Sequence, residues 1–304
     1  MAIYHASAKI IKRSAGRSAT AAAAYRAGSE IEDERTGEVH NYTRKGGVGH
    51  AEIIAPAGSP DWVQDRSRLW NAVELAENRK DAQVAREFEV AIPRELSPAQ
   101  ARQLVRSFAQ EQFVSLGMIA DICHHNEGGD NPHAHILLTM REIGPDGFGK
   151  KAREWNRTEL LEQWRAEWAE SANEALELAG HAARIDHRTL EAQGEDRTPQ
   201  IHHANRPIRI ERNEAIKAGN IERLVAKVAA AISAGKARVL GAVQAVQQAI
   251  RPSQTEEPQQ QPEIPSNDEY SDEYESEYSD EYGDSPDNAG PDTGPAPSAG
   301  PDGP

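Results

Sequence analysis

Residues 118–141 read MIADICHHNEGGDNPHAHILLTMR, and this stretch decides the fold more than any other part of the chain. An apolar run ends in two histidines, the turn-forming residues NEGGDNP follow, and a second apolar run begins at His133. Two short apolar runs separated by Gly, Asp, Asn and Pro are typical of antiparallel strands joined by a tight connection. The stretch therefore predicts two neighbouring strands of one sheet.

The same stretch places several imidazoles at one end of that strand pair. His133 and His135 are two positions apart, so their side chains point to the same face of a strand. The preceding strand ends at His124 and His125, and a tight turn brings His125 back beside His133. Three imidazoles that converge with open coordination positions can bind a metal ion and still accept a substrate oxygen. The alternative is a set of ordinary surface or core histidines.

The segments around this pair predict an α+β fold. Residues 2–10 and 85–93 have the composition or the alternation of strands. Four segments have the caps or the amphipathic periodicity of helices: 18–28 (SATAAAAYRAG), 61–80, 97–117 and 157–180. Residues 29–50 are charged and glycine-rich without a period, and we expect them to form a loop or lid. Because the order begins strand, helix, strand, strand, we expect a mainly antiparallel sheet with helices packed on its faces.

The composition changes towards the C-terminus. Residues 206–250 carry an alanine-rich, basic helical pattern, whereas residues 251–304 hold 15 acidic residues, one basic residue and 10 of the 18 prolines. The tail repeats NDEY, SDEY, ESEY and SDEY, and it has too few apolar residues to offset the entropy of ordering, so we expect disorder. We therefore expect a globular domain at 1–205, a helical extension at 206–250 and an acidic tail at 251–304.

The charge and the cysteine content limit the class of protein. The formal net charge of -15 at pH 7 resides almost entirely in the tail, because the first 250 residues hold 34 acidic and 33 basic residues. The single cysteine, Cys123, excludes an internal disulfide and fits a reducing compartment. No segment has the length or the hydropathy of a secretory signal or a membrane span. These features predict a cytoplasmic protein without membrane insertion.

The N-terminal segment carries positive charge and no acidic residue. Its cations up to residue 26 are Lys9, Lys12, Arg13, Arg17 and Arg26. Such a segment could contact the phosphate groups of a nucleic acid. The alternative is a solvated helix face.

Three further residues could carry chemistry. Glu87 and Glu89 share one face of the predicted strand, where a carboxylate could orient a metal-binding imidazole or take up a proton. They could equally be a solvent-facing pair on an edge strand. Tyr25 lies among alanines, and a tyrosine hydroxyl can attack a phosphodiester if it loses its proton and a metal neutralises the phosphate. A helix tyrosine that only packs would have the same local sequence.

Taken together, five motifs resemble the MobA/MobL relaxases of mobilisable plasmids, which are HUH endonucleases. The motifs run in the family's order from Met1 to about His203: MAIYH, AAAAYRAG, EFEVAIP, HNEGGDNPHAH, and ARIDHRTLEAQG at 183–194. The two histidines of the HUH name correspond to His133 and His135. The resemblance implies the HUH relaxase fold, a five-stranded antiparallel sheet with helices on its faces.

The resemblance also implies a reaction. Tyr25 matches the nucleophile that attacks the nic-site phosphate and forms a 5′-phosphotyrosine adduct, from which the strand can be rejoined after conjugative transfer. Three histidines match the residues that bind a divalent metal ion, usually Mg²⁺ or Mn²⁺: His125, His133 and His135. Either Glu87 or Glu89 matches an acidic residue near that metal.

The partners implied by the resemblance are DNA and transfer proteins. The DNA is the plasmid origin of transfer, bound partly as a hairpin and partly as a single strand, with the basic N-terminal residues, Lys9 to Arg26, as candidate contacts. The protein partners are relaxosome accessory proteins, a coupling protein and a type IV secretion apparatus.

Two other functions fit part of the sequence. A metal hydrolase of cupin type also uses His-x-His, but it would need more strands and fewer helices than this chain offers. A mobilisation protein that binds DNA without catalysis would keep the histidines as structural residues. Covalent attachment of DNA to Tyr25 would distinguish a relaxase from both.

Overall fold

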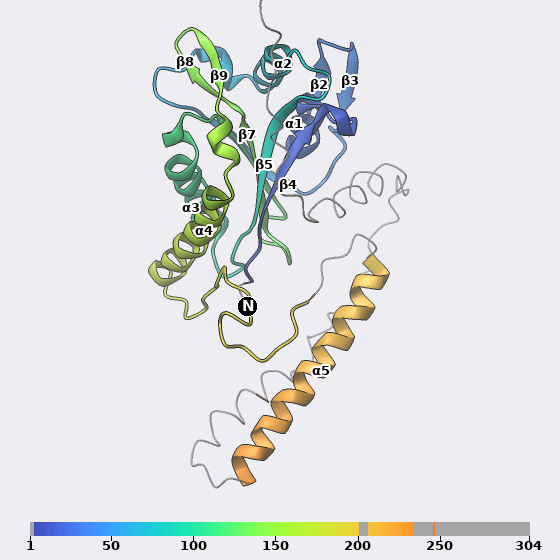
Figure 1. The fold of residues 1–304 in the computed structure, drawn as a ribbon, viewed down its shortest axis with the longest axis vertical. Coiled ribbons are helices and arrows are strands. Elements are labelled where there is room, and N and C mark those ends of the chain that lie inside the picture. The colour runs from blue at the N-terminus through green and yellow to red at the C-terminus, as the bar shows by residue number, and fades with distance from the viewer. Residues whose placement is uncertain (1–2, 201–205, 234–245, 247–304) are drawn as a thin grey trace, which may run out of the picture. The chain divides into compact units, whose positions relative to one another are not determined.

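Five strands form one antiparallel sheet in the computed structural model of the chain, which describes residues 3–200, 206–233 and 246 (Figure 1). Their order across the sheet is β1-β5-β7-β6-β4. The bounds are Ala6–Lys12 for β1, Val48–Ile54 for β4, Gln83–Ala91 for β5, Ala120–His125 for β6 and His133–Thr139 for β7. The predicted strand pair of residues 118–141 is therefore the β6–β7 pair inside this sheet.

Helices and two small hairpins complete the described part of the chain. The helices are α1 (Ala19–Ala27), α2 (Arg66–Ala76), α3 (Pro98–Gln112), α4 (Thr158–Leu178) and α5 (Arg206–Ser233). The hairpins are β2 (Glu30–Asp33) with β3 (Glu38–Asn41), and β8 (Arg141–Gly144) with β9 (Gly147–Lys151). The predicted α+β class, with an antiparallel five-stranded sheet and helices on its faces, is confirmed.

Alternation along β7 assigns the two faces of the sheet. Ala134, Ile136 and Leu138 are buried on one face, where they pack in the same core as residues of α3 and α4. An aromatic cluster fills this layer: Phe88 of β5 lies 5.9 Å from Phe108 and 6.2 Å from Trp164 between ring centroids. Both helices present a stripe of buried residues to this face, and they lie side by side against it (Figure 1).

The opposite face carries α1 and α2. Leu137 of β7 and Ile11 of β1 are buried there against the alanines of α1 and against Leu69 and Trp70 of α2. His133 and His135 are in phase with Leu137, so strand geometry directs them to this face, beside α1. The face that holds the histidines is thus the one that also carries the helix of Tyr25.

The expectation that residues 29–50 form a loop or lid is wrong for most of this range. The structure has the β2–β3 hairpin there, and then the first residues of β4, which is the fifth strand of the sheet and pairs with β6. Strands of four residues are too short to show a period. β4 begins with the polar, glycine-containing sequence VGHAE and lies at an edge, so its residues are mostly half-buried and do not alternate clearly.

The chain divides into two compact units, with the first covering Met1–Thr189 and the second beginning at Leu190. The boundary expected after residue 205 stays a prediction. Helix α5 lies within the predicted helical extension, whereas residues 247–250 and the acidic tail at 251–304 lie outside the described residues. Among the described helices, none combines the length and the apolarity needed to cross a bilayer.

Candidate metal and nucleophile site

Three histidines converge at one end of the α1 face of the sheet. His125 ends β6, and it pairs across the strands with His133, the first residue of β7. The ring centroids of His125, His133 and His135 are 4.7 to 5.3 Å apart. One nitrogen from each ring lies within 4.8 Å of the others, so the three can hold a metal ion. The predicted convergence of these imidazoles is confirmed.

Each of the three rings donates one N–H to a fixed internal acceptor. His125 donates from Nε2 to the Arg26 carbonyl at 2.7 Å, and His133 donates from Nδ1 to the Asn131 carbonyl at 2.8 Å. His135 donates from Nδ1 to the Glu87 carboxylate at 2.6 Å. Because these acceptors fix the tautomers, the lone pairs of the other ring nitrogens stay available, as a metal site requires.

The same environment keeps two of the imidazoles uncharged. Burial, together with a smaller effect of the neighbouring His135, lowers the pKa of His125 to about 3. Burial also lowers the pKa of His133. The positive charge of Lys45 adds to both shifts. Neutral imidazole is the form that binds metal, so the donor set fits a divalent cation near neutral pH.

Glu87 is a buried carboxylate that accepts a hydrogen bond from a histidine of this cluster. Its side chain is 1% exposed and accepts two hydrogen bonds from Arg26, from Nε at 2.5 Å and from Nη2 at 2.6 Å. Burial alone would raise the pKa of Glu87, but the Arg26 charge and the contacts with His135 hold that pKa well below its usual range. The ionised carboxylate can therefore orient His135.

Glu89 has a different main partner. It accepts a hydrogen bond from Lys9 Nζ at 2.9 Å, and His5 Nε2 lies 3.8 Å away. Glu89 also lies close enough to Glu87 and His135 to belong to a second possible set of metal ligands. Among the contacts described, Glu87 accepts a hydrogen bond from a histidine of the cluster and Glu89 does not.

Helix α1 places the residue next to Tyr25 in contact with the cluster. The helix begins with Ser18, whose side chain accepts a hydrogen bond from the Ala21 N–H, and it ends at Gly28 in the left-handed conformation. Five of its six alanines are buried, so the helix backbone can approach the sheet closely. Tyr25 is half-buried and directly precedes Arg26, whose carbonyl accepts the hydrogen bond from His125. Two segments that are 99 residues apart are joined by this contact.

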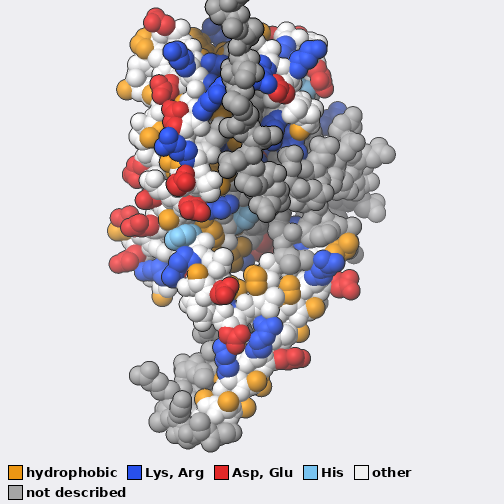
Figure 2. Space-filling view, in the orientation of Figure 1, with side chains coloured by type: hydrophobic (Ala, Val, Ile, Leu, Met, Phe, Trp, Pro, Cys, Tyr) orange, Lys and Arg blue, Asp and Glu red, His pale blue; other side chains and the backbone are white. Residues whose placement is uncertain are grey.

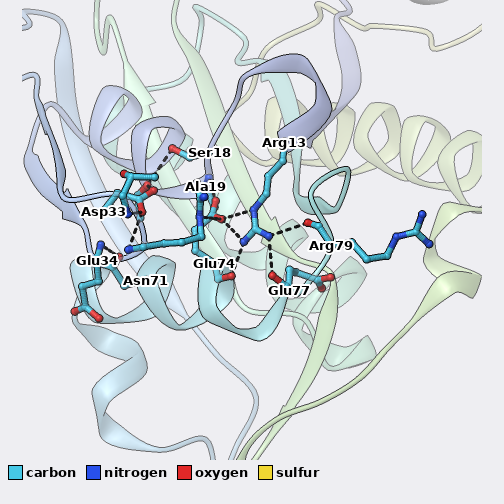
Figure 3. A network of polar contacts seen from close by, with 12 residues as sticks. Arg13, Ser18, Ala19, Asp33, Glu34, Asn71, Glu74, Glu77 and Arg79 are labelled. Atoms are coloured by element: carbon cyan, nitrogen blue, oxygen red, sulfur yellow. Dashed lines mark hydrogen bonds and ion pairs between the residues drawn. The ribbon is translucent and has the colours of Figure 1, made fainter.

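The other end of α1 is anchored by a buried carboxylate (Figure 3). Glu74 of α2 is fully buried and accepts a hydrogen bond from the Ala19 N–H at 2.6 Å. Arg13 donates to the same carboxylate from Nε and Nη2, at 2.9 and 2.6 Å. Thr20, in the first turn, donates to Asp33 at 2.7 Å. These contacts fix α1 against α2 and the β2 strand, and so they help to place Tyr25.

The structure places Arg13 and Arg26, two of the expected DNA contacts, in buried ion pairs. The Arg13 side chain is 8% exposed and bound to Glu74, and the Arg26 side chain is 6% exposed and bound to Glu87. Each guanidinium balances a buried carboxylate, so little of its surface is left to contact a phosphate. Lys9 is paired with Glu89. The DNA contacts of Lys12 and Arg17, which are half-buried, stay predictions.

Acidic and basic side chains are interspersed over the face shown in Figure 2. A surface of mixed charge does not by itself mark a DNA-binding face, in contrast to a stripe of one sign. Three of the five cations of the N-terminal segment form internal ion pairs: Lys9, Arg13 and Arg26. The linear sequence could not reveal these pairs.

Lys45 is the residue at this site that the sequence did not indicate. It follows β3, in the segment that we expected to be loop or lid. Its ammonium lies 3.4 Å from the centroid of the Tyr25 ring and donates to the Tyr25 carbonyl at 3.0 Å. The ring of Tyr42 meets that of Tyr25 edge to face, with centroids 5.2 Å apart. No periodic or compositional signal distinguishes Lys45 from the neighbouring Arg44.

Known proteins resemble this chain over most of the described region. Residues 17–213 match the family model described as the MobA/MobL family. A curated protein named Mobilization protein MobL, from Acidithiobacillus ferridurans, is 44% identical over 236 residues, which cover 66% of this chain and 62% of that protein. A Conjugal transfer protein TraA from Agrobacterium fabrum is 38% identical over 66% of this chain and 21% of its own length.

A solved structure agrees with these matches. It is described as the molecular basis of vancomycin resistance transfer in Staphylococcus aureus, and it is 34% identical to this chain, with a TM-score of 0.58. The match covers 62% of this chain and all of that one. This chain spans less than two-thirds of the length of the two curated relatives described above.

Proposed function

The chain belongs to the MobA/MobL family, and on this premise we propose that it is a DNA relaxase that nicks one strand at a plasmid origin of transfer and rejoins it after conjugative transfer. Relatives named for mobilisation and conjugal transfer support this role. The observation that carries the proposal is the hydrogen bond that joins α1 to His125, in a cluster of three imidazoles whose tautomers are fixed for metal binding.

We assign the nucleophile to Tyr25. Its phenolic oxygen forms a bond to the phosphorus at the nic site, and the phenolic proton is lost to solvent. The bond from phosphorus to the 3′ oxygen breaks, and that oxygen leaves with the electron pair and takes up a proton. Because the phosphodiester energy is kept in a 5′-phosphotyrosine, a 3′ hydroxyl can later attack the same phosphorus and release Tyr25. A hydrolytic nuclease would form no such adduct.

His125, His133 and His135 would hold a divalent cation, which we propose to be Mg²⁺ or Mn²⁺. Such an ion, when bound, stabilises the negative charge on the scissile phosphate as a Lewis acid. Glu87 holds His135 in the tautomer that leaves Nε2 unprotonated, and Arg26 keeps Glu87 ionised. These two residues therefore prepare the ligand set without touching the substrate.

We propose that the DNA is bound partly as a single strand, so that the nic phosphate can reach Tyr25, and partly as a hairpin. We propose that Lys12 and Arg17 of the N-terminal segment, which are half-buried, contact phosphate groups of the DNA. The proposed protein partners are relaxosome accessory proteins, a coupling protein and a type IV secretion apparatus, and the proposed compartment is the cytoplasm.

Formation of a covalent adduct tests the proposal. The full chain would be incubated with Mn²⁺ and single-stranded oligonucleotides, labelled at the 3′ end and tiled across both strands of the DNA that flanks the gene. We expect the wild type and Tyr4→Phe, a control away from α1, to give a denaturant-resistant band. Tyr25→Phe should give none while its dissociation constant for the oligonucleotide, measured by fluorescence anisotropy, is unchanged.

Two outcomes would contradict the assignment. Binding without an adduct from the wild type, with every oligonucleotide, would favour a mobilisation protein that binds DNA without catalysis. An adduct that persists in Tyr25→Phe would place the nucleophile on another residue.

A further inference from the structure

The segment after β3 is packed tightly on the C-terminal end of α1. Gly28 has a φ of +60°, and a Cβ atom there would lie 3.3 Å from Val48 Cγ2 and 3.7 Å from the carbonyl oxygens of Lys45 and Tyr42. The Tyr42 N–H donates to the Ser29 carbonyl, and the Lys45 N–H donates to the Tyr42 carbonyl, at 3.0 and 2.9 Å. The loop that carries Lys45 is therefore held by backbone contacts against the helix of Tyr25.

Two side chains of this loop, those of Lys45 and Tyr42, contact the Tyr25 ring. Lys45 Nζ lies 3.4 Å from the ring centroid, and hydrogen bonding to the Tyr25 carbonyl holds the ammonium in that place. Tyr42 contacts the ring at an interplanar angle of 89°. A cation over an aromatic face is attracted by the electron density of the ring. A phenolate carries a full negative charge, so the same cation stabilises it more than it stabilises the phenol.

We propose that Lys45 is a positioning residue that acts through Tyr25: its ammonium holds the ring and stabilises the negative charge of the attacking oxygen. The inference deepens the proposed relaxase function and rests on it. Lys45 acts through its charge and takes no part in proton transfer. As the bond from the Tyr25 oxygen to phosphorus forms and the bond to the 3′ oxygen breaks, the phenolic proton goes to solvent and the 3′ oxygen is protonated from solvent.

A purely structural role for Lys45 is the competing explanation. A lysine near the last turn of a helix can stabilise it by donating to a terminal carbonyl. In that case its loss would lower the stability of the protein, and the chemical step would change only through unfolding. The contact with the ring face, in addition to the carbonyl contact, favours the electrostatic role.

The test uses the full chain, Mn²⁺ and the single-stranded oligonucleotide that gives the strongest wild-type adduct. Lys45→Met removes the charge and keeps much of the volume, Lys45→Arg keeps the charge, and Arg44→Met is the matched control because Arg44 is exposed in the same loop. The measurements are the single-turnover rate of adduct formation with saturating oligonucleotide, the dissociation constant and the melting temperature.

We expect Lys45→Met to lower the single-turnover rate roughly tenfold to a hundredfold, with a dissociation constant within about twofold of the wild type. Lys45→Arg should recover most of that rate, and Arg44→Met should leave it unchanged. Replacing Tyr25 by a fluorinated tyrosine, which has a more acidic phenol, should restore part of the rate lost in Lys45→Met.

Three results would overturn the inference. They are an unchanged rate in folded Lys45→Met, a rate in folded Lys45→Arg as low as that in Lys45→Met, and no recovery with the fluorinated tyrosine. If the wild type itself forms no adduct, the proposed function fails instead, so the two failures can be told apart.

Discussion

Replacing Arg26 by methionine removes the positive half of a buried ion pair. The Arg26 and Glu87 side chains are only 6% and 1% exposed, and two hydrogen bonds of 2.5 and 2.6 Å join them. Removing one partner of such a pair leaves an uncompensated buried charge, which costs about 3–5 kcal/mol. Since a domain has a free energy of unfolding of about 5–15 kcal/mol, Arg26→Met should lose a large part of it.

A double-mutant cycle measures this effect. Unfolding of the full chain by urea would be followed by circular dichroism, in the presence of a chelator, for Arg26→Met, Glu87→Gln and the double variant. We expect the double variant to lose less stability than the two single variants together, by about 1–3 kcal/mol, because it contains no unpaired charge. The salt dependence of DNA binding should not change in folded Arg26→Met, since the guanidinium is buried.

Two results would refute this reasoning. One is a free energy of unfolding for Arg26→Met within about 1 kcal/mol of the wild type, which would mean that Glu87 is not held as a buried anion. The other is strict additivity in the cycle, because residues in direct contact should be coupled.

Three further predictions follow from the same contacts. Glu87→Gln should weaken Mn²⁺ binding, measured by calorimetry, about tenfold to a hundredfold, because His135 loses its anionic acceptor. Glu89→Gln should weaken Mn²⁺ binding less. Equal losses in the two variants would contradict the different roles of the two carboxylates. Phe88→Ala should lower the free energy of unfolding by about 3–5 kcal/mol in urea, because Phe88 is fully buried among aromatic rings; a loss below about 1 kcal/mol would argue against that packing. Burial raises the pKa of Tyr4 from 10.0 to about 12, so the unfolded chain loses this proton first and stability should fall as pH rises through that range. Tyr4→Phe should make the fall less steep in urea titrations, and an identical slope would show that Tyr4 does not contribute.

The sequence predicted the elements whose signals are local. Ser18 and Gly28 define the ends of α1 because a hydroxyl can cap the first turn and glycine can adopt the left-handed conformation that ends a helix. The spacing of His133 and His135, with His125 across a turn, predicted their convergence because side chains alternate along a strand. By contrast, β4 begins with polar residues at a sheet edge, and it becomes a strand through pairing with β6, which no local period reports.

What the sequence by itself determined is therefore the α+β class, the cluster of three histidines and the helix that carries Tyr25. Only the tertiary structure decided which charges face one another. Arg13 and Arg26 look like cations available to DNA, but they are bound to Glu74 and Glu87, which are 61 residues away in each case. The position of Lys45 over Tyr25 was equally hidden. The physical reason is that local patterns encode strand and helix periodicity, whereas ion pairing depends on packing between segments far apart in the chain.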